Sequence, residues 1–515
     1  MDGAFPVLAM LVLLPVVTAV AVAFVPRRHE SLIFPLAVTL STMPLAVALY
    51  VLWEFEVGEA GFQFSQQVSW YAPWGVSWNV GIDGISLLLV VLTTLLFPIS
   101  LLASASIRKN IKMYMVAMLV LETGLLGVFL SLDLIVFFVF FEVTLIPMYL
   151  LIGMWGSGRR VYAAIKFVLY TALGSGFLFT GIIFLAVTGA DQLGGLTFDY
   201  RELMTLQLST GTQTWLFLAF GAAFAIKVPL FPFHTWLPDA HTEAPTAASV
   251  LLAGVLLKLG TYGLLRFNLG LFPRAAVDLA PWVAGLAVVG IIYGAVVAIV
   301  QPDIKRLVAY SSVSHLGFIV LGIFALTSQG LQGGVVQMVN HGLTTGALFL
   351  LVGMIYDRRH TREISEYGGL ARVMPLFAGF FLFTAFASIG LPGLNGFIGE
   401  FKILLGSYIT LPVHAIVAAF GVVLAAVYML WAYERMFNGP VSKTENQGLS
   451  DLSGRELAII IPIAALIVFL GVYPKPALDR IEPSVERILD RIELVADYDT
   501  PDPGRMADIA AGEGE

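Results

Sequence analysis

The sequence predicts an all-α polytopic membrane protein with about 14 transmembrane helices, on the basis of three observations. Of its 515 residues, 58% are hydrophobic and only 12% are charged. Apolar runs of about 20 residues, long enough to cross a bilayer as a helix, recur along the chain. Two of these runs are interrupted by proline and glycine, as are the broken helices of many transporters. A soluble protein of several domains is far less apolar than this.

The chain begins with an apolar run from Ala4 to Val25, preceded by a single charged residue, Asp2. A secretory signal has positive charge before a shorter core, so this run is predicted to be an uncleaved first span. The later spans are predicted, from runs of the same kind, near 32–53, 82–104, 113–130, 134–155, 164–188, 213–241 (broken), 246–267, 276–300, 307–326, 333–356, 374–409 (broken), 413–437 and 457–473.

Lysines and arginines in the connections predict the orientation, because cytoplasmic loops are enriched in them. The loops after the odd-numbered spans contain 16, among them Arg108, Lys109, Arg159 and Arg160, whereas the other loops contain few. The odd-numbered loops are therefore expected in the cytoplasm. An even number of spans then places both termini outside it.

Two segments outside the spans have their own patterns. The alternation in FQFSQQVSWY, between residues 54 and 79, predicts a short exposed hairpin. After Pro474, the run RIEPSVERILDRIELV predicts a surface helix, followed by a disordered terminus. The 42 residues from Pro474 to Glu515 hold 11 acidic and 5 basic residues, most of the net charge of -7, so the membrane body is almost neutral.

The two broken spans predict an internal repeat. The Ala-Phe-Ala of the first, at 223–225, occurs again before the break in TAFASIGLPGLNGFIGEFK, five spans later. Broken helices at corresponding positions favour two inverted five-helix repeats. The expected domains are helices 1–3 in 1–112, the first repeat (helices 4–8) in 113–268, the second (helices 9–13) in 269–438, and helix 14 with the acidic tail in 439–515.

Two lysines lie within predicted spans. Lys227 is followed by Pro229 and Pro232, which interrupt a helix, and Lys258 is equally isolated in the next span. A lysine at a helix centre costs about 2.5–3.5 kcal/mol. Because burial disfavours its charged form unless a carboxylate opposes it, both lysines are candidates for proton relay.

Two carboxylic acids are similarly isolated. Glu142 is the only charge in LIVFFVFFEVTLIPMYLLIGMW, and Glu400 follows 27 uncharged residues and the break at 390–393. Both are predicted to be functional, since a buried acid is too costly for packing alone. Lys402 points to another helix face than Glu400 and is explained more simply as a side chain that reaches the membrane interface. Lys166 can be an interface anchor or a water-channel residue.

Histidines titrate near neutral pH and can supply intermediate steps. His315 and His341 lie in VAYSSVSHLGF and QMVNHGLTTGA, among small and polar residues that suit a hydrated channel. Histidines satisfied within the core are the alternative. His234 and His241 flank the first break and can equally well have a capping or loop role.

The sequence lacks several patterns for other chemistry. It has no P-loop and no Rossmann glycine motif between a strand and a helix. No HExxH or clustered metal-ligand spacing is present, and zero cysteines exclude disulfides and thiolate-held metal centres. We therefore expect no metal and no cofactor in this chain, and energy must come from an ion gradient or a partner.

Three runs carry a family resemblance: KVPLFPFHTWLPDAHTEAPTAASVLLAGVLLKLGTYG, QPDIKRLVAYSSVSHLGF and LPGLNGFIGEF. They resemble the subunit M (chain 4) family of proton-translocating NADH–quinone oxidoreductase, respiratory complex I, one of the antiporter-like subunits. The resemblance places the family's relay groups on Glu142, Lys227, Lys258 and Glu400. The related L and N subunits carry lysine at the last of these positions, as do Mrp-type sodium/proton antiporters.

The resemblance implies a subunit of a translocase that has no redox centre of its own. NADH, flavin, iron–sulfur clusters and quinone are expected in partner subunits. The expected partners are L-like and N-like antiporter subunits and the lipid bilayer of a bacterial cell membrane, with no nucleic acid.

The expected mechanism starts from a pair in which Glu142 holds Lys227 protonated. Loosening of this pair by a redox-driven change moves a proton towards Lys258. Water and the two channel histidines, His315 and His341, then carry it to a carboxylate that releases it outside. Two alternatives remain: a subunit of a stand-alone Mrp-type antiporter, and a lipid-facing scaffold, which does not explain four isolated charges within the membrane.

Overall fold

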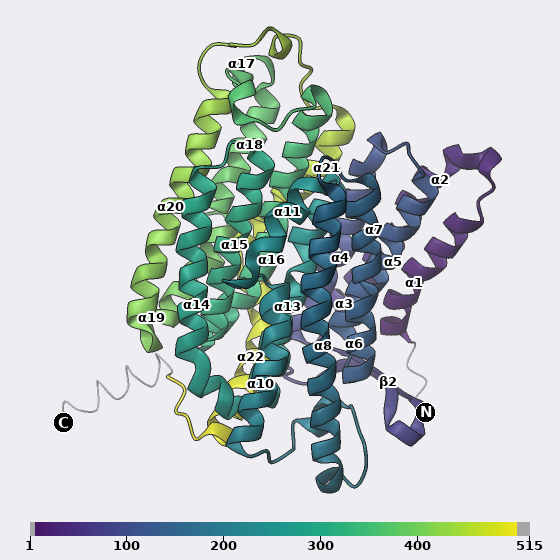
Figure 1. Cartoon of the computed structure of the whole chain (residues 1–515), viewed down its shortest axis with the longest axis vertical. Coiled ribbons are helices and arrows are strands. Elements are labelled where there is room, and N and C mark those ends of the chain that lie inside the picture. Colours follow the sequence, from purple (N-terminus) through teal and green to yellow (C-terminus); the bar gives the residue numbers. More distant parts are fainter. Residues whose placement is uncertain (1–5, 502–515) are drawn as a thin grey trace.

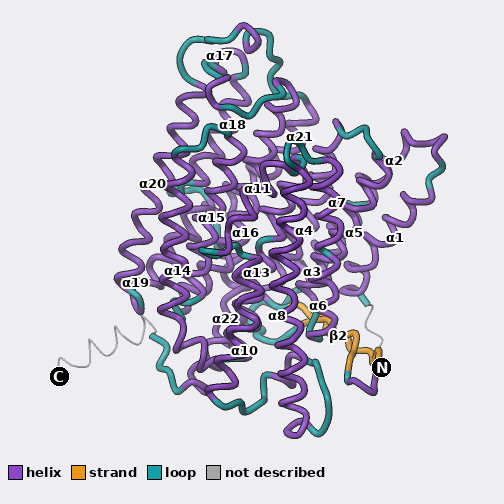
Figure 2. Tube along the Cα trace, viewed as in Figure 1, coloured by secondary structure: helices purple, strands orange, loops and turns teal. Residues whose placement is uncertain are grey.

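A computed structural model of the chain describes residues 6–501. Figures 1 and 2 show an elongated bundle of helices with a two-stranded sheet near its lower end. We call the end with the sheet and α22 (Lys475–Ala496) the hairpin end, and the opposite end, where α17 (Leu370–Val373) lies, the basic end.

The first half of the chain supplies one side of the bundle and the sheet (Figure 1). Its elements are α1 (Val7–Phe24), α2 (Ile33–Leu40), α3 (Thr42–Glu54), β1 (Gln63–Tyr71), β2 (Val76–Ile82), α4 (Gly84–Ala103), α5 (Ile111–Leu130), α6 (Leu134–Val143), α7 (Leu145–Trp155), α8 (Arg160–Leu193), α9 (Tyr200–Leu203), α10 (Thr210–Lys227) and α11 (Trp236–Glu243).

The second half supplies the centre of the bundle and the far side. Its elements are α12 (Thr246–Leu251), α13 (Lys258–Gly263), α14 (Pro273–Ile299), α15 (Ile304–Ile323), α16 (Ser328–Arg359), α18 (Pro375–Ser388), α19 (Asn395–Thr410), α20 (Pro412–Phe437) and α21 (Gly454–Val472), besides α17 and α22.

Twelve helices within residues 6–501 are long and apolar enough to cross a membrane. Two further spans are broken, one between α10 and α11 and the other between α18 and α19. Together they occupy the fourteen predicted positions, so the predicted fold class is confirmed. The division into four domains stays a prediction.

The most buried helices mark the centre of the bundle. In the segment 246–269 and in α16, the most apolar window is entirely buried, whereas only 44% of the corresponding window in α1 is buried. These two central segments carry Lys258 and His341, so the candidate residues lie away from the lipid-facing surface.

Aspartates determine where several helices begin. Asp133 precedes α6, and its Oδ1 accepts hydrogen bonds from the backbone N–H groups of Ile135 (2.9 Å) and Val136 (3.1 Å). Asp303 caps α15 in the same way. An acidic side chain at this position satisfies helix N–H groups that otherwise lack a partner, which explains why spans start directly after LSLD and QPD.

The predicted hairpin and surface helix are both present, but only β1 of the hairpin is exposed, since β2 is almost entirely buried, and the helix lies against the start of α4. β1 pairs antiparallel with β2, and Val68 lies opposite Trp78. The backbone N–H of Gly84, at the start of α4, donates to Ser484 Oγ of α22 at 3.0 Å. A Cβ at Gly84 would lie 1.7 Å from the carbonyl oxygen of Arg480, so only glycine permits this approach. The predicted disordered terminus falls almost entirely outside the described residues.

Candidate functional site

Lys258 lies between two π-helical segments, Leu252–Leu256 and Leu264–Leu269. Its side chain is fully buried, and its Nζ donates a hydrogen bond to the carbonyl oxygen of Ala253, in the first of these segments. π-helical turns frequently occur at functional sites. Here the irregular turn supplies a backbone acceptor for a lysine that has no carboxylate against it among the described residues.

Lys258 is joined to the neighbouring helix through a histidine. Its Nζ lies 2.7 Å from Nδ1 of His341 on α16, within hydrogen-bond distance. The imidazole of His341 lies beside that of His315 on α15, with ring centroids 5.8 Å apart. All three side chains are buried, although they come from three different spans.

Glu400 completes this row of side chains. Its Oε1 lies 2.7 Å from Nδ1 of His315 and accepts a hydrogen bond from Nε2 of Gln337 at 3.1 Å. The other ring nitrogen of His315 lies 3.3 Å from both Ser388 Oγ and Tyr428 OH. The structure therefore brings the lysine, the two histidines and Glu400 together in one buried polar row, which we call the central row (Lys258, His341, His315 and Glu400).

The second broken span positions Glu400. Gly390 and Gly393 have φ values of +76° and +92°, a conformation that glycine adopts at little cost. A Cβ at Gly390 would come within 3.3 Å of Glu400 Oε2, so the carboxylate lies directly against the break. The Gly-Leu-Pro-Gly sequence thus ends α18 and lets the acid on α19 face the interior.

Lys227 is the last residue of α10, at the first break, and it is buried. Its Nζ lies 4.7 Å from the ring centroid of Phe141. Trp236 Nε1 donates to the carbonyl oxygen of Ile226 at 2.9 Å and so satisfies a backbone group near the break. The first proline break is therefore closed by protein.

The expected pairing of Glu142 with Lys227 takes a different form from a salt bridge. Glu142 lies half-buried on α6, and it is the charged group that interacts electrostatically with Lys227. The salt bridges of residues 6–501 do not include this pair. The interaction is thus of longer range than a direct contact.

Two other lysines, Lys166 and Lys402, lie outside the central row. Lys166 forms a salt bridge with Asp239 at 2.8 Å and donates to the carbonyl oxygen of Thr235 at 2.9 Å, so it joins α8 to the first break. Lys402 is half-buried and interacts electrostatically with Glu482, on α22.

Sequence reasoning missed one acid of the same kind as Glu142. Glu122 is the lone charge between residues 113 and 130, and it is fully buried in α5. Neither of its carboxylate oxygens has a hydrogen-bond partner within the described part of the chain. The criterion that selects Glu142, isolation in an apolar run, would also have selected Glu122.

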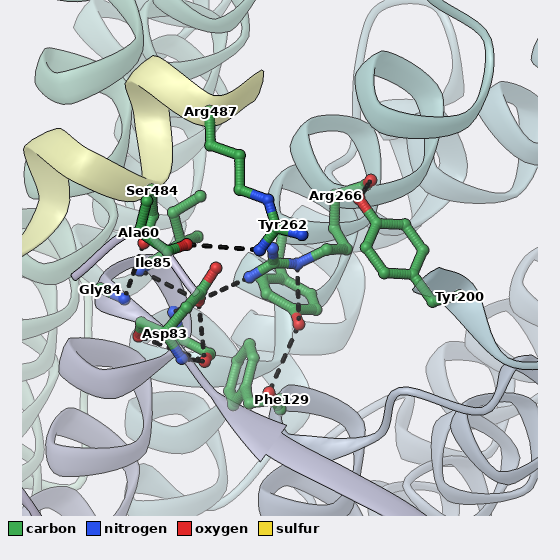
Figure 3. Close-up of polar contacts among 11 residues, drawn as sticks. Ala60, Asp83, Gly84, Ile85, Phe129, Tyr200, Tyr262, Arg266, Ser484 and Arg487 are labelled. Atoms are coloured by element: carbon green, nitrogen blue, oxygen red, sulfur yellow. Dashed lines mark hydrogen bonds and ion pairs between the residues drawn. The ribbon is translucent and has the colours of Figure 1, made fainter. Parts of the chain in front are cut away.

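A buried ion pair at the hairpin end was also missed (Figure 3). Arg266 Nη2 lies 2.6 Å from Asp83 Oδ1, and both side chains are 4% exposed. Arg266 Nε also donates to Tyr262 OH at 3.3 Å, and the hydroxyl of Tyr200 donates to the carbonyl oxygen of Arg266 at 2.9 Å. The partners are 183 positions apart, so no local pattern signals the pair.

The central row has the chemistry of proton transfer. Its members are titratable, and a proton can pass from one nitrogen or oxygen to the next along hydrogen bonds. Within residues 6–501, no group of three or more His, Asp or Glu side chains could hold a metal ion.

Known proteins resemble the chain over nearly its full length. The family model described as "NADH:quinone oxidoreductase/Mrp antiporter, TM" matches residues 131–427. NADH-quinone oxidoreductase subunit M of Rhodobacter capsulatus is 44% identical and covers 98% of this chain and 99% of its own.

Solved structures share the fold. A chain of respiratory complex I from Thermus thermophilus is 32% identical, with a TM-score of 0.86 and coverage of 94% of this chain and 99% of that chain. A chain of the Mrp complex from Dietzia has a TM-score of 0.81 at 21% identity, covers 96% of this chain and 100% of that one, and shows the fold alone. From its match to the family model and its identity with the Rhodobacter protein, this chain belongs to the subunit M family of NADH-quinone oxidoreductases.

Proposed function

We propose that this chain is the proton-translocating, non-redox membrane subunit M of an NADH–quinone oxidoreductase. It couples NADH oxidation and quinone reduction, which take place in partner subunits, to the movement of protons through the membrane. The observation that supports this proposal most strongly is the central row, in which four buried titratable groups from four spans lie side by side.

The proton passes along the central row in a defined order. Lys258 receives it in the first predicted repeat (113–268) and passes it to His341, and His315 delivers it to Glu400 in the second (269–438). Glu142 and Lys227 lie upstream of this row, where a change in their electrostatic interaction controls whether Lys227 gives up its proton. Glu400 then releases the proton on the opposite side.

The distribution of basic residues supports one direction across the membrane. The basic end faces the cytoplasm of a bacterium and the hairpin end faces outwards, so protons are taken up at the basic end. In this orientation both termini lie outside the cytoplasm. L-like and N-like antiporter subunits are neighbours in the membrane, and flavin, iron–sulfur clusters, NADH and quinone belong to the partner subunits.

A second candidate is a subunit of a stand-alone Mrp-type sodium/proton antiporter, which the fold of the Dietzia Mrp chain also fits. Glutamate at position 400 favours the first candidate, since the lysine of the related subunits is absent there.

The test is purification of the tagged chain from its own membranes in a mild detergent. We expect flavin and iron–sulfur proteins in stoichiometric amounts, together with NADH:quinone reductase activity. A complex of small membrane proteins that exchanges sodium for protons, without flavin, would contradict the proposed function and support the second candidate.

A further inference from the structure

A cavity of about 190 Å³ opens at the basic end of the bundle. It lies among α11, α15, α16 and α21 and the loops beside them, and its lining includes Glu243, Lys305, Asp357, Arg362 and Glu456. Charged side chains of both signs give water many partners in such a cavity. The central row lies deeper in the bundle, so the cavity raises the question of which group connects the two.

His241 lies on α11, two residues before Glu243 of the cavity wall. Its side chain is completely buried. Its ring stacks on that of Phe349 of α16, with centroids 4.7 Å apart and planes 7° from parallel. Stacking holds the plane of the imidazole while leaving its two nitrogens at the ring edge.

Neither ring nitrogen of His241 has a hydrogen-bond partner within residues 6–501. The hydrogen bond from Ser249 Oγ goes to the backbone oxygen of His241, at 3.0 Å, and leaves the ring unpartnered. A buried polar group without a partner costs about 1–3 kcal/mol. A histidine kept only for packing could be replaced by an aromatic residue without that cost, so the two free nitrogens point to a ligand, and water from the cavity is the simplest one.

Charged groups of both the cavity and the central row act on His241. The ring interacts electrostatically with Lys305, which lines the cavity, and with Lys258. His341, the hydrogen-bond partner of Lys258, interacts with His241 as well. The backbone of Glu243 is fixed by a hydrogen bond from the Ser157 N–H to its carbonyl oxygen at 2.9 Å, which holds the end of α11 against the cavity.

We propose that His241 carries protons from the basic-end cavity to Lys258, an inference that rests on the proposed function. One ring nitrogen accepts a proton from cavity water, and the other donates its proton, through water, to the neutral amine of Lys258. The imidazole is neutral before and after the step, and its two nitrogens have exchanged roles. A turn of the ring, or proton exchange through the neighbouring water, then restores the starting tautomer.

Two substitutions of His241 test this assignment. His241→Phe keeps the stacking on Phe349 and removes both nitrogens, while His241→Ala opens a space of the size of the ring. The measurement is NADH:quinone reductase activity in inverted membrane vesicles with an uncoupler, normalised to assembled complex on native gels. We expect both variants to lose at least about tenfold in rate, as removal of a positioned proton-transfer group does. His414→Gln, in the first turn of α20 and outside the central row, is the matched control and should keep the parent rate.

Chemical rescue distinguishes proton transfer from packing. In inverted vesicles the basic end faces the medium, so added imidazole can reach the cavity and fill the space in His241→Ala. We expect imidazole to restore part of the lost rate in this variant, and pyrazole, which has the same shape and is a much weaker base, to restore none. Equal rescue by the two compounds would overturn the assignment, because filling the space would then suffice.

Lys258→Ala, measured in parallel, separates this inference from the proposed function. If His241→Phe assembles and works like the parent while Lys258→Ala is inactive, protons reach Lys258 by another way and the role of His241 is wrong. If both variants keep the parent rate, the central row itself is not the proton pathway.

Discussion

Glu400 is held from two sides, by His315 and by Gln337, and this arrangement suits a carboxylate that gains and loses a proton. A charged Glu400 can only accept a hydrogen bond from Nδ1 of His315, whereas a protonated Glu400 can donate one to it. The imidazole of His315 can accordingly carry its proton on Nδ1, which faces Glu400, or on Nε2, which faces the hydroxyl groups of Ser388 and Tyr428.

Substitutions at Glu400 separate titration from shape. Glu400→Gln keeps the size of the side chain and removes the titrating group, so proton pumping should fall at least about tenfold. Glu400→Asp keeps the carboxylate one methylene further from His315, and a water molecule can bridge the gap, so it should retain substantial activity. Acidification of vesicles, with assembly checked on native gels, decides between them. Equal pumping by both variants and the parent would remove Glu400 from the pathway.

Glu142→Gln tests the first charge in the proposed sequence. Glu142 interacts electrostatically with the buried Lys227, and its loss leaves the protonated lysine without that support. Because no direct salt bridge is broken, the complex should still assemble, yet coupled quinone reduction should fall severely. Parent-like pumping by fully assembled Glu142→Gln would contradict a role for this charge.

Isolation in an apolar run predicted the individual charges of the site but not their partners. Lys258 and His341 are 83 positions apart, and His315 and Glu400 are 85 positions apart. Such pairs depend on how spans pack, which no local pattern specifies. The geometry between Glu142 and Lys227 depends on this packing too, and the two charges interact electrostatically without forming a salt bridge.

At the scale of secondary-structure elements, two of the candidate side chains, Lys227 and Glu400, lie at helix breaks. The breaks after Lys227 and before Glu400 were predicted, because proline and the Gly-Leu-Pro-Gly sequence leave local signals. The two π-helical segments around Lys258 were not, since neither contains a proline that would signal an interruption of the helix. Tertiary packing of a fully buried span, rather than sequence, selects the irregular turns there.

At the hairpin end, the Asp83–Arg266 pair connects the hairpin and the start of α4 with the span that carries Lys258 (Figure 3). Asp83→Asn keeps the N-cap acceptor of α4 but leaves the Arg266 charge buried without its counter-charge. Breaking a buried pair in this way costs about 3–5 kcal/mol. We therefore expect a lower midpoint of thermal dissociation of the assembled complex.

Lys475→Ala is the matched control for Asp83→Asn. It removes a surface pair with Asp479 in which the lysine side chain is 70% exposed. Surface pairs contribute little to stability, so the midpoint should be unchanged. Similar midpoints for the two variants would show that the buried pair does not hold the hairpin end together.

For the whole molecule, hydropathy alone predicted the fourteen spans, because a bilayer imposes a fixed length on every apolar helix. The hairpin and α22 were predicted from their periodicities. Hydropathy does not predict which spans pack against one another. The central row exists only because the segment 246–269, α15, α16 and α19 meet in the middle of the bundle.

The central claim is that protons cross the membrane through the central row, and the most direct test is the number of protons moved per NADH oxidised by Lys258→Ala in inverted vesicles. Lys402→Ala is the matched control, since Lys402 is a half-buried lysine outside the row. With both complexes assembled to the parent level, we expect Lys258→Ala to move fewer protons per NADH than the parent and to lose at least about tenfold in turnover, and Lys402→Ala to behave like the parent. An assembled Lys258→Ala complex that moves the parent number of protons per NADH would contradict the claim.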